Sequence, residues 1–257
     1  MRMKWTLIAA LLAGAGCLAS TSVEVRPSVE LGKKVYRKAC LTCHGVAGDG
    51  AGPVARLFKP APRDFTRGVY KFRSTPSGQL PTDADLYRTI STGIPGTGMP
   101  AWAPHLSPGE RRAVAMYIKL FFPKFATRGA RHEIKIGKQP KRTADSIARG
   151  RKTYTDMQCG KCHGPTGRGD GPSSGELKDD RGRPIAPYDM TTGRYRGGST
   201  ARDIYRTIAT GVSGTPMPGY GDAATPQQTW DLAYFVQSLE RPSGIIDYAF
   251  VKRPSWQ

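Results

Sequence analysis

The sequence is poor in acidic residues, histidines and cysteines for a chain of 257 residues. It contains 20 Asp and Glu residues against 39 Lys and Arg residues, which gives a formal net charge of +19. Only 38% of the residues are hydrophobic, while 31 are Gly and 21 are Pro. This composition predicts small, loop-rich domains whose cores need a large apolar group to fill them. The length alone allows one domain or two.

Near the N-terminus, one mostly apolar run stands apart from this polar background. Arg2 and Lys4 precede the uncharged stretch from Trp5 to Ala15. A short basic segment followed by a hydrophobic run of this length is the order found in secretory signals, and the run is too short to span a bilayer comfortably. We therefore expect residues 1–19 to be an export segment and the protein to be exported to the periplasm.

The export segment contains the first of the five cysteines, Cys17. It follows Ala15 and Gly16, which resembles the processing site of bacterial lipoproteins, although Gly14 stands where that pattern usually has Leu. We predict that Cys17 is lipidated and anchors the protein to a membrane. Ordinary cleavage nearby, for instance after Ala19, is the alternative.

The other four cysteines belong to two copies of the motif Cys-x-x-Cys-His, placed 119 residues apart. This motif is typical of covalent attachment of a c-type haem. Two thiols on one helical turn can add to the two vinyl groups of a porphyrin, while the adjacent histidine offers its imidazole to the iron. The predicted attachment residues are Cys40, Cys43, His44, Cys159, Cys162 and His163.

Two other readings of Cys-x-x-Cys remain open at this point. One is a thioredoxin-like redox pair, and the other is a zinc site that draws four cysteines from both motifs. Neither requires the histidine that follows each motif. Two covalent haems also leave no cysteine pair for a disulfide, since Cys17 alone remains.

An internal repeat with offsets of 118 and 119 residues spans most of the chain. It predicts two domains at 27–125 and 147–241, joined by a basic linker at 126–146 and followed by a tail at 242–257. Gly32 and Gly150 are equivalent in the repeat and lie inside predicted helices. Because glycine is unfavourable in a helix interior, we expect another helix to cross closely at both positions.

Each half predicts three helices from its apolar spacing and its proline positions. The predicted helices are Val29–Ala39, Asp83–Thr92 and Pro108–Phe121 in the first half, and Ser146–Met157, Ala201–Thr210 and Pro226–Leu239 in the second.

The repeat also indicates the sixth ligand of each iron. Met99 aligns with Met217 at an offset of 118, and a proline follows each of them. Other methionines have no methionine partner in the repeat, and the spare histidines His105 and His132 have no partner at all, although His105 is kept as an alternative to Met99. Coordination by histidine and methionine raises the reduction potential of the haem relative to coordination by two histidines. It also leaves the iron without an open position for a substrate, as an electron carrier requires.

These motifs resemble the class I cytochrome c family twice over, through each Cys-x-x-Cys-His sequence and its Met-Pro pair, Met99-Pro100 and Met217-Pro218. The resemblance covers roughly residues 28 to 125 and 146 to 240. It implies an all-α fold, a small helical bundle around each haem, and transfer of single electrons between exported or membrane-bound respiratory partners. A di-haem enzyme such as a peroxidase, with one open iron, is the alternative function.

If haems are present, their propionates need hydrogen-bond donors. The repeat pairs Tyr70-Lys71-Phe72-Arg73 with Tyr195-Arg196-Gly197-Gly198. We expect Tyr70, Arg73, Tyr195 and Arg196 to contact the propionates. Trp102 and Tyr220, each three residues after the predicted methionine ligand, are expected to close the distal side.

The positive charge is unevenly distributed. The first domain has 15 basic and 6 acidic residues, whereas the second has 13 and 10. Such charge can attract nucleic acid, but export and haem binding favour an acidic redox partner or an anionic membrane surface instead. We therefore predict that the first domain docks on an acidic protein and that the chain binds no nucleic acid.

Overall fold

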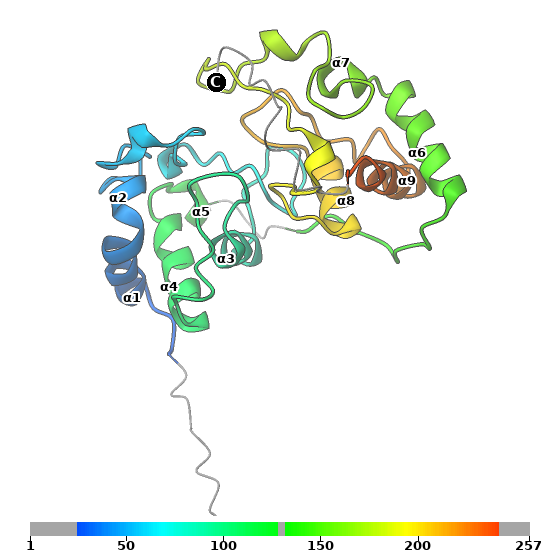
Figure 1. Cartoon of the computed structure of the whole chain (residues 1–257). Coiled ribbons are helices and arrows are strands. Elements are labelled where there is room, and N and C mark those ends of the chain that lie inside the picture. Colours follow the sequence, from blue (N-terminus) through cyan, green and yellow to red (C-terminus); the bar gives the residue numbers. More distant parts are fainter. Residues whose placement is uncertain (1–24, 128–131, 242–257) are drawn as a thin grey trace, which may run out of the picture.

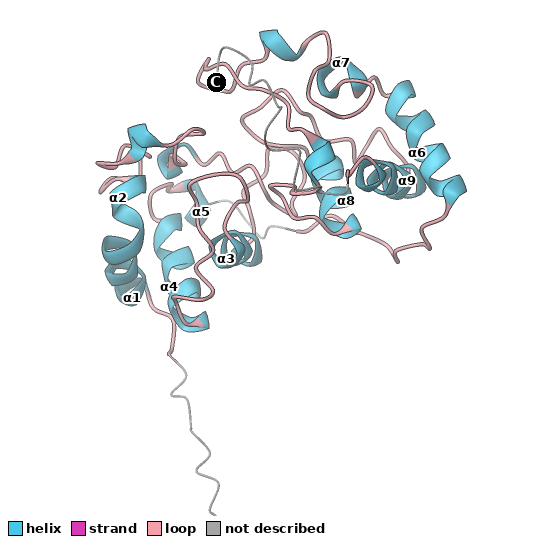
Figure 2. Ribbon diagram, viewed as in Figure 1, coloured by secondary structure: helices cyan, strands magenta, loops and turns pink. Residues whose placement is uncertain are grey.

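The computed structural model describes residues 25–127 and 132–241, which form two helical lobes lying side by side (Figure 1). Within these residues the regular structure is helical, without strands (Figure 2). The all-α prediction is therefore confirmed for the described part of the chain. Each lobe has its own hydrophobic core, one around Tyr36 and Val114 and the other around Trp230 and Phe235.

The first lobe contains α1 to α5 and the second contains α6 to α9 (Figure 1). The helices are α1 Val29–Val35, α2 Leu41–His44, α3 Asp83–Thr92, α4 Pro108–Lys119, α5 Lys124–Thr127, α6 Ala144–Asp156, α7 Gly160–His163, α8 Ala201–Thr210 and α9 Pro226–Ser238.

The middle helices α3 and α8 begin and end where the sequence predicts. Capping boxes explain their starts, because the side chain of Thr82 or Thr200 accepts a hydrogen bond from the backbone three residues later and the acidic residue there bonds back. The helix α6 begins at Ala144, two residues earlier than predicted, because Thr143 and Ser146 form the same kind of box.

The first helix of each lobe differs from its prediction near the haem-attachment motif. In the first lobe, α1 gives way to a π-helical turn, Tyr36–Cys40, that runs directly into the motif. The second lobe has one more residue here, and α6 ends at Asp156, after which Gln158 takes a left-handed φ of 59°. This extra residue explains why the offset between equivalent positions of the repeat changes from 118 to 119 at the motif.

The predicted close crossing of helices at Gly32 and Gly150 is confirmed. A Cβ atom on Gly32 would overlap the backbone carbonyl of Ala113 in α4, and one on Gly150 would overlap the carbonyl of Asp231 in α9. Glycine thus lets the first and last helices of each lobe pack backbone against backbone.

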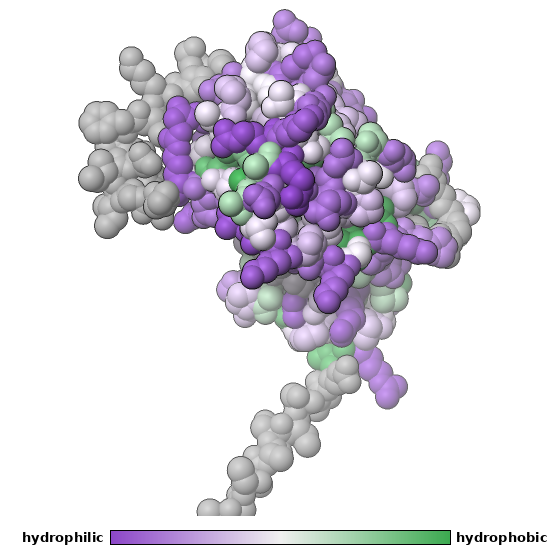
Figure 3. Space-filling model, turned by 90° about the vertical axis from the view of Figure 1, so that its right-hand side faces the viewer, coloured by the Kyte–Doolittle hydropathy of each residue, from purple (hydrophilic) through white to green (hydrophobic). Residues whose placement is uncertain are grey.

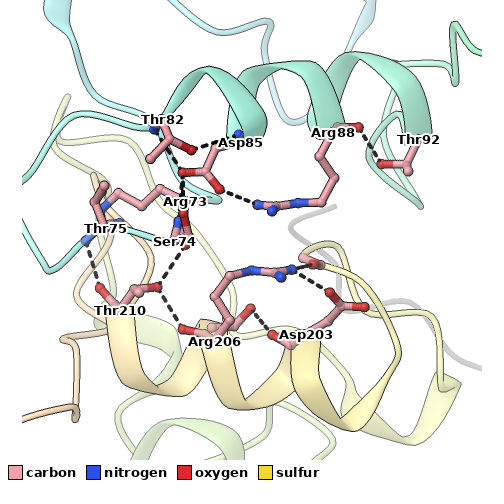
Figure 4. A network of polar contacts seen from close by, with 12 residues as sticks. Arg73, Ser74, Thr75, Thr82, Asp85, Arg88, Thr92, Asp203, Arg206 and Thr210 are labelled. Carbon is pink, nitrogen blue, oxygen red and sulfur yellow. Dashed lines mark hydrogen bonds and ion pairs between the residues drawn. The ribbon is translucent and has the colours of Figure 1, made fainter. Parts of the chain in front are cut away.

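The two lobes meet along a polar seam between α3 and α8 (Figure 4). Arg73 of the first lobe is almost fully buried, and its Nη2 atom donates to the carbonyl of Thr210 at the end of α8, at 2.7 Å. A Cβ atom on Gly197 would lie 3.2 Å from the ring of Phe72. The lobes are therefore joined by buried side chains as well as by the connecting chain.

Part of the predicted linker also packs on the lobes. Ile134 and Ile136 lie against the core of the second lobe, and the amide of Ile134 donates to the carbonyl of Ser74 at 2.7 Å. Tyr234 donates to the carbonyl of Pro140. The connection thus follows the surface of both lobes in its described portion.

Candidate functional site

His44 ends α2 and is held in one orientation by backbone and ring contacts. Its Nδ1 atom lies 3.0 Å from the carbonyl of Arg63, so that nitrogen donates and Nε2 keeps its lone pair. The ring of Phe65 stacks on the imidazole, with 4.5 Å between centroids and 21° between planes. Burial lowers the pKa of His44, although the Arg63 carbonyl opposes this. A neutral, oriented imidazole is the form that binds iron.

His163 has the equivalent place at the end of α7, with a looser environment. Its Nδ1 atom is buried and makes no hydrogen bond of standard geometry, yet the carbonyl of Tyr188 opposes the lowering of its pKa by burial. Met190 stands where the repeat has Phe65 in the first lobe. An aromatic ring therefore stacks on the first histidine, whereas the equivalent position of the second lobe is a methionine.

A buried tyrosine fixes the turn after each histidine. Tyr36 donates to the carbonyl of Gly45 at 2.7 Å, and Tyr154 donates to the carbonyl of Gly164 at 2.7 Å. The sequence reveals the repeat of these tyrosines but not their role. Together with the carbonyl of Arg63 and the ring of Phe65, they are the positioning contacts that sequence reasoning missed.

The four motif cysteines are half-buried and form no disulfide with one another. Burial, together with the neighbouring thiol, raises the pKa of Cys40 to about 12, and burial raises the pKa of Cys159 to about 11. A thioredoxin-like pair needs a thiol with a lowered pKa, so these values argue against that reading. The zinc reading needs both motifs together, yet residues 25–127 and 132–241 contain no group of three His, Cys, Asp or Glu side chains placed for a metal ion.

Met99 and Met217 lie in loops with the same hydrogen bonds. The carbonyl of Met99 accepts from the amide of Ile94 at 3.0 Å, and its amide donates to Thr97 Oγ1 at 3.2 Å. In the second lobe, the carbonyl of Met217 accepts from Val212 at 3.1 Å. The amide of Met217 likewise donates to a threonine hydroxyl, at 3.3 Å. Both side chains are half-buried.

Glycines at the ends of α3 and α8 bring these loops against the helices. Gly93 and Gly211 have left-handed φ values of 65° and 70°. A Cβ atom on Gly93 would lie 2.5 Å from the backbone of Pro100, and one on Gly211 would lie 2.5 Å from the backbone of Pro218. The chain just after each methionine is therefore fixed against the preceding helix.

The neighbouring aromatic and histidine residues agree in part with the sequence reading. Trp102 and Tyr220 are half-buried and pack against the first and second cores. Burial raises the pKa of Tyr220, and the thiols of the second motif raise it further, which places its ring near them. His105 and His132 are exposed.

Several buried polar atoms on the segments 70–73 and 195–198 have no hydrogen-bond partner. In the described residues these include the hydroxyl of Tyr70, Nη1 of Arg73 and Nε of Arg196. Burial and the neighbouring cations Arg63 and Arg196 lower the pKa of Lys71 to about 8. Buried donor atoms without an acceptor, beside several cations, fit the carboxylates of a haem.

Tyr195 differs from the other predicted propionate donors. Its hydroxyl lies 3.0 Å from the carbonyl of Met190 and 2.9 Å from that of Val236. One hydroxyl proton is therefore already engaged by two backbone carbonyls, whereas Tyr70 has no partner.

Known protein families match both lobes. The family model described as cytochrome C oxidase, cbb3-type, subunit III, matches residues 27–118. The family model described as cytochrome c matches residues 147–240. Neither match extends over the boundary between the lobes, so the chain holds two such units in tandem.

A solved structure is similar over most of the chain. It is a chain of the Kuenenia stuttgartiensis reducing HAO-like protein complex Kustc0457/Kustc0458, with 42% sequence identity and a TM-score of 0.80. The match covers 86% of this chain and 100% of that chain. The chain belongs to the di-haem class I cytochromes c. This di-haem cytochrome carries two covalently attached c-type haems with iron, so the predicted cofactors are confirmed.

A curated relative matches a shorter segment. The cbb3-type cytochrome c oxidase subunit FixP of Azorhizobium caulinodans is 28% identical over 92 residues, which are 36% of this chain and 27% of that protein. The chain thus matches about a quarter of the length of this relative. Like the solved structure, it supports an electron-transfer role among redox proteins.

The export segment and Cys17 lie outside the described residues. In the ranges that the structure describes, no helix is long and apolar enough to cross a membrane. Lipidation of Cys17 stays a prediction, and the intact mass of the mature protein decides it.

Proposed function

We propose that this di-haem cytochrome passes single electrons through two six-coordinate haems, with His44 and Met99 as ligands in the first domain and His163 and Met217 in the second. The observation that carries the proposal is the repeated Met-Pro loop, whose hydrogen bonds are the same in both domains. Each haem supplies an iron that alternates between ferrous and ferric states.

The protein's own residues would attach and orient these haems. Cys40 and Cys43, and their counterparts Cys159 and Cys162, provide the thiols for the covalent bonds. The carbonyl of Arg63 holds the imidazole of His44 through Nδ1. Because the first-domain imidazole is stacked by Phe65 while Met190 occupies that place in the second domain, the two irons are expected to have different potentials.

The propionates would occupy the seam between the domains. Tyr70, Arg73 and Arg196 have buried donor atoms available, and Lys71 adds a cation. Tyr195 would contribute mainly by packing, since its hydroxyl is engaged by carbonyls. Haem carboxylates at this place would neutralise a buried excess of positive charge.

The competing function is an enzyme with one open iron. Replacement of Met99 or Met217 by Ala tests it, because each change should open one iron, turn that haem high-spin and lower its potential. We expect the oxidised protein to show a weak near-infrared sulfur-to-iron band. Each variant should lose the part of that band that comes from the haem whose methionine was replaced. Absorption and electron paramagnetic resonance spectra measure both effects.

The matched control is Met116→Ala, which removes a thioether from α4 and should leave the spectra unchanged. An unmodified protein that lacks the near-infrared band, or that already contains a high-spin haem, contradicts the proposed ligands and favours the enzyme.

We further propose that an acidic redox partner docks on the first domain. The relatives are named as an oxidase subunit and as part of a protein complex, which supports work beside a redox partner. Figure 3 shows the side of the second domain, which is mostly hydrophilic with small hydrophobic patches. In the described residues, the exposed large hydrophobic side chains are Val25, Val46, Leu57 and Leu120. The excess of basic over acidic residues in the first domain is the feature that supports an acidic partner.

The helices α1 and α6 allow a matched test of this docking. Lys33 and Lys34 are exposed on α1, and their repeat equivalents on α6 are Arg151 and Lys152. In the second pair, Lys152 is already paired with Asp156 at 2.6 Å. Reversing the α1 pair to Glu should slow electron transfer with an acidic partner by about tenfold at low salt, because it removes steering.

Stopped-flow kinetics at several ionic strengths measure this effect, and the α6 variant is the control with the same change in charge. Arg149 is left intact in that control because it pairs with buried Asp231 at 2.8 Å. Equal slowing by the two variants, or rates that do not depend on salt, would refute docking through the first domain.

A further inference from the structure

The segment Lys178–Arg183, which lengthens the second domain relative to the first, folds as a short hairpin. The carboxylate of Asp179 accepts from the amide of Arg181 at 2.9 Å and from Nε of Arg183 at 2.8 Å. Burial raises the pKa of Asp179, but the hydrogen bonds from Arg183 and Arg181 outweigh this and lower it to about 2. A single bridge joins Lys178 and Pro184. The hairpin is therefore closed by its own contacts.

The tip of this hairpin reaches the first domain through two crossed ion pairs. Asp180 pairs with Arg67 at 3.0 Å, and Arg181 pairs with Asp64. Arg67 also donates to the carbonyl of Asp180 at 3.3 Å. Asp64 and Arg67 stand at the two ends of the short 3-10 helix Phe65–Arg67. The hairpin thus holds both ends of that helix.

The helix held in this way is the one that orients His44. Phe65, its first residue, stacks on the imidazole, and the residue just before Asp64 is Arg63, whose carbonyl bonds to Nδ1. Asp64 also caps the helix, since its carboxylate accepts from the amide of Thr66 at 3.0 Å. Movement of the hairpin would therefore change the orientation of His44, the proximal ligand of the first haem.

The same hairpin contacts the methionine loop of its own domain. The amide of Asp180 donates to the carbonyl of Gly214 at 3.2 Å, three residues before Met217. A Cβ atom on Gly214 would lie 2.9 Å from Val69 of the first domain. One residue, Asp180, is thus bonded both to the segment beside His44 and to the loop that carries Met217.

We propose that the hairpin Lys178–Arg183 is a positioning element that couples the two haem sites, through Asp180 and Arg181. The proposal rests on the proposed role of Met217 as an iron ligand. The contacts of this hairpin would fix both the segment beside His44, on the proximal side of the first haem, and the loop that carries Met217, on the distal side of the second. A change at the hairpin should then alter both haems, although the hairpin contacts neither ligand directly.

The test uses a double variant of the full-length holoprotein, Asp180→Asn with Arg181→Gln. It removes both ion pairs to the first domain and leaves the net charge unchanged, so a general electrostatic effect is minimised. The backbone bond from Asp180 to Gly214 remains, so a change at the second haem must be transmitted by movement of the hairpin. The control is Asp83→Asn with Lys119→Gln, which breaks an ion pair of 2.9 Å between α3 and α4 with the same charge balance. Midpoint potentials of both haems are measured by spectroscopic redox titration.

In the double variant, we expect the ratio of ferrous to ferric iron at a fixed potential to change by about threefold for both haems. A change of this size is expected because a partly exposed ion pair contributes only a modest free energy. Amide hydrogen exchange should also accelerate in residues 63–67 and 214–217. The control should change neither. Asp180→Arg alone should shift both potentials in the same way, and the addition of Arg67→Asp, which re-forms that ion pair with its charges swapped, should bring them back toward those of the unmodified protein.

A shift at one haem alone, or at neither, would overturn the coupling, and so would a swapped pair that restores nothing. The near-infrared band of the unmodified protein tests the methionine ligands independently of the hairpin. Its absence refutes methionine ligation, whereas its presence together with unshifted potentials refutes the role of the hairpin.

Discussion

Replacement of Gly32 or Gly150 by alanine is expected to destabilise the domain that contains it by about 3 kcal/mol, because the new methyl group must enter backbone packing that has no room for it. The overlap in each case is with a backbone carbonyl of the last helix, which has no side-chain rotamer to relieve it. Helix propensity alone predicts the opposite sign, since alanine is favoured over glycine inside a helix by about 1 kcal/mol. The measurement is denaturant unfolding of each variant, followed by helix content.

Gly175→Ala is the matched control in the second domain, because a Cβ atom at that position meets nothing within 4 Å and the φ angle is ordinary. It should change the free energy of unfolding by less than about 0.5 kcal/mol. If Gly150→Ala is as harmless as the control, the helices are not locked together at this crossing.

Replacement of Asp85 by alanine is expected to cost about 3 to 5 kcal/mol, because it leaves several buried donors without an acceptor. Asp85 is fully buried, and its carboxylate accepts from the amide of Ser74 at 2.8 Å and from the amide of Thr82 at 3.0 Å. It also pairs with Arg88 at 2.8 Å. Figure 4 shows this carboxylate between α3 and the segment that carries Arg73. The loss should therefore loosen the seam between the domains as well as α3, and calorimetry measures it.

Asp203 is the equivalent capping residue of α8 and provides the comparison. It pairs with Arg206 at 2.6 Å and accepts from Thr200, but 22% of its side chain remains exposed. Asp203→Ala should cost about 1 kcal/mol, as for an ordinary cap. A similar loss at both positions would contradict the idea that burial of Asp85 makes the difference.

The local features of the fold follow well from the sequence. The bounds of α3 and α8 agree with the predicted ranges, and the structure gives the reason: a threonine and an aspartate three residues later begin each helix, and a glycine follows its last residue. The crossing at Gly32 and Gly150 also follows, since glycine recurs where it is unfavourable. Both attachment motifs follow from their spacing alone.

Contacts that depend on backbone atoms or on the other domain do not follow from the sequence. The carbonyl that orients His44 belongs to Arg63, and the residue type at a position does not indicate what its backbone oxygen contacts. The π-helical turn Tyr36–Cys40 was missed because a one-residue difference between the repeats does not say how the chain absorbs it. The hairpin around Asp180 reads as a surface insertion until its partners in the first domain are known.

The packing of Phe72 against Gly197 shows what a single polypeptide allows at the seam between two similar domains. These residues are equivalent in the repeat, so the same position of each domain touches itself, as a residue does at the two-fold axis of a homodimer. Two identical subunits would place two phenylalanines or two glycines there, and would either collide or leave a gap. Fusion into one polypeptide lets one copy enlarge while the other shrinks. The seam can therefore pair one large and one small residue at the same position of the repeat.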